Sequence, residues 1–175
     1  MISLLLLCHD ASGAAANTAL LRERVARSLA SLVEGCVVGV IADASLLGPR
    51  HVDLEDIADE AGCHVFADDS PRDGLRRALE TARLADVFLL AAGFALDRGF
   101  FEEARDAASF GGLKRPRVLR AAPDTLLTRL NPSLARPVGL LARKETIVAA
   151  DSAEIALLAR RLKAADLAAV ARRTL

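Results

Sequence analysis

The chain has 175 residues and no net formal charge, and 53% of its residues are hydrophobic. This length suits one domain with a full core, and the hydrophobic content excludes a disordered chain. The balanced charge gives no global reason to expect nucleic acid as a partner. We therefore predict a single globular domain over residues 1–175 that does not bind nucleic acid.

Three cysteines, Cys8, Cys36 and Cys63, are odd in number and lie far apart. Each lies in an apolar run, as buried free thiols do, which favours a cytoplasmic location. The histidines form no zinc-binding pattern with them. The apolar run at 2–7 is too short for a membrane span and has no basic region before it. We therefore read it as a strand and not as a signal peptide.

Charge is unevenly distributed along the chain. Residues 111–145 carry 8 basic and 2 acidic side chains. Such a segment can face a phosphate group or an anionic membrane, which would allow peripheral membrane contact; the alternative is an ordinary solvated surface.

The hydrophobic pattern predicts strands that alternate with helices. Continuous apolar runs predict buried strands at residues 2–8, 36–42, 63–66, 86–90, 117–120 and 137–142. Helical spacing and capping residues predict helices at 15–33, 53–61, 71–84, 99–110, 123–130 and 151–172, the last with Asp151 and Glu154 as caps. This alternation indicates a three-layer α/β/α sandwich with a mostly parallel central sheet.

Ligands of such sheets bind at the carboxyl ends of the strands. The predicted strand at 86–90 is followed by Ala91-Ala92-Gly93. These side chains can neither bind a metal nor transfer a proton. No phosphate-binding P-loop, dinucleotide-binding glycine motif or nucleophile elbow is present. The neighbours Cys8 and His9 would point to opposite faces of an extended strand, which argues against a nucleophile–base pair.

Six segments nonetheless occur in a familiar order. They are residues 2–3 at the start of the first strand, 29–32, 40–45, 57–63, 86–101 and 138–144. In this order the chain resembles family 2 glycosyltransferases of the GT-A type, and in particular short bacterial glycosyltransferase-like proteins. The resemblance implies a GT-A fold and a UDP- or GDP-linked nucleotide-sugar as the ligand.

The resemblance also implies a set of binding residues. Asp43, expected with Ser45 at the carboxyl end of the strand at 36–42, matches the aspartate that hydrogen-bonds the nucleotide base. His9 and Asp10 after the first strand are candidates to contact the base or a phosphate. The alternatives are an Asp43 that satisfies turn amides and a His9 that is simply a polar loop residue.

The family's metal-binding Asp-x-Asp aligns with Ala91-Ala92-Gly93, so we expect no divalent metal, and the family's acidic base has no clear counterpart after Gly111. Protein cations can replace a metal's charge in such folds. The candidates, which otherwise are solvated surface residues, are Arg143-Lys144 after the last predicted strand and Arg72, Arg76 and Arg77.

Two functions follow from these observations. The first is a glycosyltransferase that acts in envelope polysaccharide or lipid synthesis. The second is a non-catalytic protein that serves as an interaction or regulatory module for a protein partner. Alanine-rich helices predicted from Ala15 and Asp151 suggest a homodimer, because such faces pack well across a two-fold axis.

Overall fold

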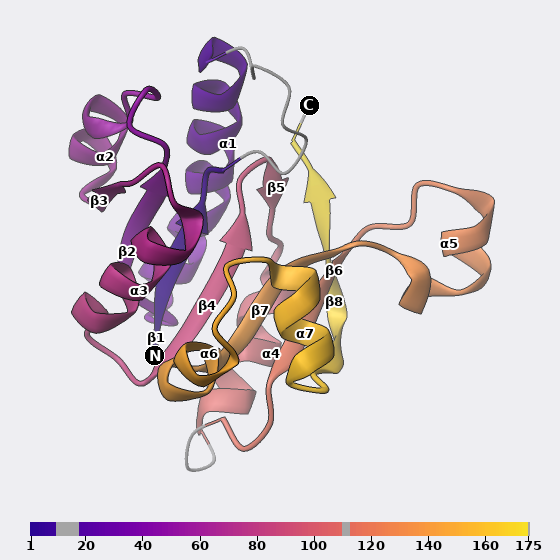
Figure 1. Ribbon diagram of the computed structural model, residues 1–175. Coiled ribbons are helices and arrows are strands. Elements are labelled where there is room, and N and C mark those ends of the chain that lie inside the picture. Colours follow the sequence, from indigo (N-terminus) through magenta and orange to yellow (C-terminus); the bar gives the residue numbers. More distant parts are fainter. Residues whose placement is uncertain (10–17, 110–112, 175) are drawn as a thin grey trace.

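The computed structural model describes residues 1–9, 18–109 and 113–174. These residues form one sheet with helices on both faces (Figure 1). The strands are β1 (Ile2–Leu7), β2 (Ile41–Gly48), β3 (His64–Ala67), β4 (Asp86–Ala91), β5 (Phe94–Ala95), β6 (Arg117–Ala121), β7 (Pro137–Arg143) and β8 (Ala165–Arg173). The helices are α1 (Thr18–Val37), α2 (Glu55–Ala61), α3 (Pro71–Thr81), α4 (Arg98–Ser109), α5 (Leu126–Leu130), α6 (Lys144–Ala150), α7 (Ile155–Arg161) and the short 3-10 helix η1 (Pro132–Leu134).

The strand order is β3-β2-β1-β4-β7-β6-β8-β5. The first four strands of this order are parallel, whereas β7 runs antiparallel to both β4 and β6. The parallel strands end at Leu7, Gly48, Ala67 and Ala91, and we call this side of the sheet the carboxyl edge. Because β7 is reversed, it is the first residue of β7, Pro137, that lies at the carboxyl edge.

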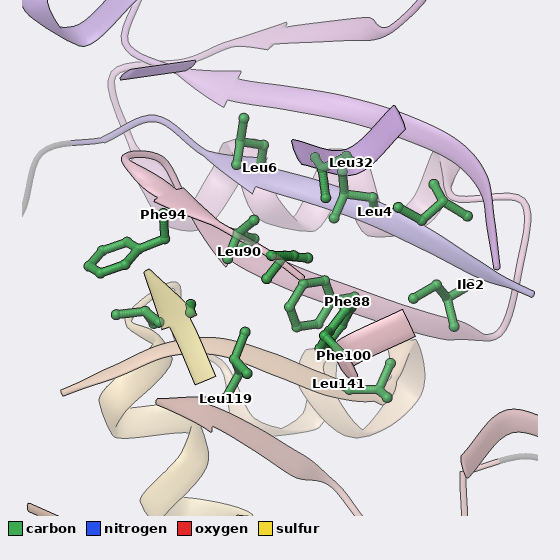
Figure 2. Packing of buried hydrophobic residues seen from close by; sticks show 14 of the residues in the cluster. Ile2, Leu4, Leu6, Leu32, Phe88, Leu90, Phe94, Phe100, Leu119 and Leu141 are labelled. Carbon is green, nitrogen blue, oxygen red and sulfur yellow. The ribbon is translucent and has the colours of Figure 1, made fainter. Parts of the chain in front are cut away.

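The central strands are buried on both faces, which explains their continuous apolar runs. Leu4 and Leu6 point into a core covered by α1, α2 and α4, whereas Leu5 points into a smaller core under α3, α6 and α7. Figure 2 shows the larger core, which includes Phe88 and Phe100. The centroids of these two rings lie 4.5 Å apart. In Figure 1, α6 and α7 lie in front of the sheet and α4 behind it. The predicted three-layer sandwich is confirmed.

Local signals located most of the elements correctly. The strands predicted at 2–8, 63–66, 86–90, 117–120 and 137–142 are confirmed to within one residue at each end. Pro71 begins α3 as predicted, and the Ser70 hydroxyl caps this helix by accepting the Asp73 N–H at 3.3 Å. Gly62 ends α2 in the left-handed conformation, with a φ of 66°.

The boundary between α1 and β2 lies further along the chain than predicted. Of the predicted strand residues 36–42, only Ile41 and Ala42 belong to β2, which begins at Ile41. Gly35 does not end the helix; a Cβ atom there would lie 2.5 Å from Cε1 of Phe101, so the glycine permits close packing of α1 on α4. The turn falls instead at Gly39, which has a φ of 71°.

The predicted terminal helix at 151–172 is also wrong. Only α7, in the first half of this range, is helical; Lys163 then adopts a positive φ of 49°, and β8 follows. Pairing of β8 with β6 and β5 buries Leu167 and Ala171, and this tertiary context overrides the helical preference of alanine. The homodimer through helices from Ala15 and Asp151 stays a prediction, and the second of these helices is shortened to α7.

The segment between β6 and β7 carries α5 and η1 and projects away from the sheet, as Figure 1 shows. We call it the arm. Its leucines are largely exposed: Leu126 to 77%, Leu127 to 70%, Leu130 to 85% and Leu134 to 62%. Apolar side chains gathered in this way are unusual on a monomer surface. Among the described residues, no helix has the length and apolar character needed to cross a membrane.

We predict that Gly35→Ala lowers the free energy of unfolding by about 1–3 kcal/mol, the usual cost of overpacking a core. The new methyl group would meet the Phe101 ring and the Ile41 side chain at 2.5 and 2.8 Å. Urea unfolding followed by circular dichroism measures the change. Glu34→Ala, at an exposed position of the same helix, is the control and should stay within about 0.5 kcal/mol of the wild type. Unchanged stability of Gly35→Ala would contradict this packing.

Candidate functional site

A cavity of about 460 Å³ opens at the carboxyl edge, beside the ends of β1 and β4 and the first turns of α1. We call it the edge cavity. Much of its wall is apolar and consists of Leu7, Cys8, Leu21, Ala91, Ala92, Gly93 and Phe94. The remaining lining residues are His9, Arg24, Arg136 and Arg173.

The three arginines of the edge cavity come from distant parts of the sequence. Arg24 lies on α1, Arg136 directly precedes β7, and Arg173 on β8 pairs with Phe94 of β5. Seven other arginines form ion pairs with carboxylates, but the structure shows none for these three among the described residues. The described lining also contains no Asp or Glu. The edge cavity is therefore cationic and lacks a counter-charge in the described part of the chain.

The loop after β4 forms one wall of the edge cavity and is fixed by α1 and β1. Gly93 has a φ of 91°, and its N–H donates to the buried Ser28 hydroxyl at 3.0 Å. The Ala92 N–H donates to the Leu7 carbonyl at 2.9 Å. The aliphatic stem of Arg24 lies against Gly93, within 3.4 Å of the place a Cβ atom would take. Both of these loop N–H groups are thus occupied, which leaves ligand binding at this wall to side chains.

His9 is oriented by the backbone of a neighbouring loop. Its Nε2 lies 2.8 Å from the Asp68 carbonyl oxygen. Because a carbonyl only accepts, Nε2 carries the proton, and Nδ1 is the ring nitrogen left for a ligand. The Asp68 carboxylate accepts the Ser70 N–H at 3.0 Å and pairs with Arg77. The bond from Ser70 and then the Arg77 charge lower the pKa of this carboxyl group, so Asp68 stays ionised and the loop stays in place.

A second cavity of about 130 Å³ adjoins the first and shares Leu7, His9, Ala91 and Arg136 with it. Its lining includes Glu154, the residue before α7. Glu154 is the N-cap residue of the shorter helix α7, whereas the sequence predicts it with Asp151 as a cap pair of a longer helix, and its side chain makes no capping hydrogen bond. We call this space the acidic cavity, because Glu154 is the acidic residue of its described lining.

Three of the residues predicted to bind the nucleotide lie away from the edge cavity. Asp43 is near the amino end of β2, where it accepts the Ser3 hydroxyl at 2.6 Å. Its predicted position after that strand is wrong, because β2 begins only two residues earlier. Ser45 is buried within β2. In the β4–β7 ladder, Arg143 lies opposite Asp86, the first residue of β4. Arg143 is therefore at the opposite edge of the sheet.

The remaining predicted residues divide into three groups. His9 lines both cavities, and Asp10 lies outside the described residues. The arginines of α3 have carboxylate partners: Arg72 pairs with Asp151, Arg76 with Asp73 and Arg77 with Asp68. These pairs neutralise the charge that was predicted to replace a metal.

No protein-family model matches the sequence, and comparison with curated proteins gave no match either. Solved structures match its fold. Glucosyl-3-phosphoglycerate synthase from Mycobacterium tuberculosis, in complex with Mn²⁺, UDP and glucosyl-3-phosphoglycerate, gives a TM-score of 0.65 at 16% identity over 100% of this chain and 72% of that chain. For 4-diphosphocytidyl-2C-methyl-D-erythritol synthase the TM-score is 0.59 at 11% identity, over 95% and 87% of the two chains. For HddC from Yersinia pseudotuberculosis it is 0.58 at 9% identity, over 100% and 90%.

The chain has the fold of the GT-A nucleotide-diphospho-sugar transferases. This outcome confirms the fold that the sequence resemblance implied. The resemblance places the metal-binding Asp-x-Asp of GT-A enzymes in the loop after β4, where this chain has Ala91-Ala92-Gly93. That loop supplies no side-chain oxygen, nitrogen or sulfur to a metal.

Among the described residues, the surroundings of the loop after β4 offer no ligand set for a divalent cation. Within residues 1–9, 18–109 and 113–174, no group of three or more His, Cys, Asp or Glu side chains could hold a metal ion. The nearest charges on the cavity wall are those of Arg24, Arg136 and Arg173, which would repel a cation. The edge cavity is instead suited to an anion.

Cys8 lines the edge cavity, but it is not a nucleophile. Burial raises the pKa of its thiol to about 12, so only about one thiol in 10⁴ is ionised at pH 8. We predict that iodoacetamide modifies the exposed Cys36 in the folded protein and leaves Cys8 unmodified. Mass spectrometry of the labelled peptides measures both sites, and labelling in denaturant is the control that modifies all three cysteines. Rapid modification of Cys8 in the folded protein would contradict this placement.

Proposed function

We propose that the protein is a glycosyltransferase that binds a UDP- or GDP-linked sugar at the carboxyl edge. One observation carries the proposal: the cationic edge cavity adjoins a cavity that contains a free carboxylate, Glu154. The first suits the diphosphate of a sugar donor, and the second suits an acceptor hydroxyl group. The GT-A fold supports this assignment, and the mycobacterial synthase of the same fold is described in complex with Mn²⁺, UDP-glucose and phosphoglyceric acid.

The transfer needs one proton acceptor and one stabilised leaving group. The acceptor hydroxyl oxygen attacks the anomeric carbon, and its proton passes to the Glu154 carboxylate. The bond from the anomeric carbon to the diphosphate breaks, and its electron pair leaves with the nucleoside diphosphate. Positive charge beside that leaving group lowers the barrier, which is the usual role of a metal or of arginines. Following the resemblance to bacterial family 2 enzymes, we propose acceptors from envelope polysaccharide or lipid synthesis.

The first prediction of this proposal concerns donor binding. A ligand that binds only the folded state, at about 100 times its Kd, stabilises it by about 2.7 kcal/mol. For a chain of this length we expect a rise in Tm of roughly 5–11 °C with at least one UDP- or GDP-sugar. Differential scanning fluorimetry with a panel of both kinds measures it, and the free sugars are the control. No rise with any member of the panel would contradict the proposal.

The second prediction concerns the base. Glu154→Gln should reduce nucleoside diphosphate release from the stabilising donor by about 10²- to 10⁴-fold, with envelope lipid extract or water as acceptor. The Kd of the donor should not change, because Glu154 lies outside the edge cavity. Glu145→Gln, an exposed position on α6, is the matched control. Turnover by Glu154→Gln at the wild-type rate would exclude Glu154 as the base.

The exposed leucines of the arm favour the second candidate function, a non-catalytic interaction module. Leu126, Leu127 and Leu130 have no apolar cover, as expected of a surface that contacts another protein. The two candidate functions make different predictions for the carboxyl edge, because an interaction module does not need to bind a nucleotide-sugar there. Absence of any nucleotide-sugar binding in the experiment above would therefore favour the module.

A further inference from the structure

The three arginines of the edge cavity differ from those of α3, each of which has a carboxylate partner. The structure shows seven arginines in ion pairs with carboxylates, including every arginine of α3. Arg24, Arg136 and Arg173 instead line one cavity without an acidic residue in its described lining. Their like charges repel one another across the cavity, and an anion would remove this repulsion.

The hydrogen-bond donors on the wall of the edge cavity indicate which kind of anion would bind there. A guanidinium group offers a planar fork of N–H donors that matches phosphate oxygens two at a time. Three such groups provide more donors than a single carboxylate can use. The N–H groups of Ala92 and Gly93 are already bonded, so these side chains would hold the anion without help from that loop.

We propose that Arg24, Arg136 and Arg173 form a metal-independent binding site for the diphosphate of the nucleotide-sugar. This inference rests on the proposed function and adds to it that positive side chains take over the charge compensation that a divalent cation provides at the Asp-x-Asp loop. The aliphatic stem of Arg24 lies beside Gly93, at an ordinary van der Waals distance from the place that a Cβ atom would take.

The test measures binding of UDP and of inorganic pyrophosphate by isothermal titration calorimetry, once with EDTA and once with Mn²⁺. For the wild type we expect both ligands to bind in EDTA, with a Kd within twofold of that in Mn²⁺. The probes separate two sources of the same chemistry: pyrophosphate reports the anion site alone, and UDP reports the nucleotide as well.

Four variants test the residues. Arg24→Met keeps the aliphatic stem against Gly93 and removes the charge, and Arg136→Gln and Arg173→Gln change exposed side chains. Each should weaken UDP and pyrophosphate binding in EDTA by roughly ten- to hundredfold, the usual effect of one charged hydrogen bond. Arg105→Gln, an exposed position on α4 outside both cavities, removes the same charge and should leave binding unchanged. The Tm of each variant reports whether it has folded.

The outcomes separate this inference from the proposed function. Binding of UDP that requires Mn²⁺, or that survives all three cavity substitutions, would overturn the arginine site and leave the transferase proposal standing. Binding of pyrophosphate through the arginines without any binding of UDP or its sugars would support the anion site and contradict the transferase proposal. Absence of binding by both probes would overturn the arginine site.

Discussion

The antiparallel pairing of β7 with β4 determines which residues meet at the carboxyl edge. It brings Leu90 opposite Gly139, and Gly139 must lack a side chain because a Cβ atom would lie 2.7 Å from Cζ of Phe88. The Phe88 ring and the β7 backbone thus pack directly against each other in the larger core. Because β7 is reversed, the residue that precedes it, Arg136, reaches the edge where the parallel strands end.

The other groups of the edge cavity depend on contacts to the same central strands. The loop after β4 is attached to α1 by the Ser28 and Ser31 hydroxyl groups, which accept the N–H groups of Gly93 and Leu96 at 3.0 and 3.1 Å. The carbonyl of Gly93 accepts the Thr174 N–H at 2.9 Å, which holds the end of β8 beside it. These contacts fix the backbone that carries the charged side chains, and a backbone already in place lowers the cost of ordering it when a ligand binds.

The sequence predicted the fold better than the site. The alternation of apolar runs and helices depends on local patterns, and it located β1, β4 and the cap of α3 well. The site depends on topology. Arg136 and Arg173 gave no sequence signal, because their place follows from the reversed β7 and from a strand that reads as an alanine-rich helix. Arg24 gave a weak sequence signal, because it is a charged residue beside the buried Leu21 and Val25 on α1. The sequence misplaces Asp43 because the predicted helix ends before Gly35, whereas this glycine lies within α1 and serves close packing.

The arginines of the edge cavity are proposed to bind a nucleotide-sugar in place of a metal. A crystal structure of the protein grown with UDP-glucose and EDTA is the decisive experiment. We expect diphosphate oxygens within hydrogen-bonding distance of at least two of Arg24, Arg136 and Arg173. A diphosphate bound at the opposite edge, near Asp43 and Arg143, would contradict it.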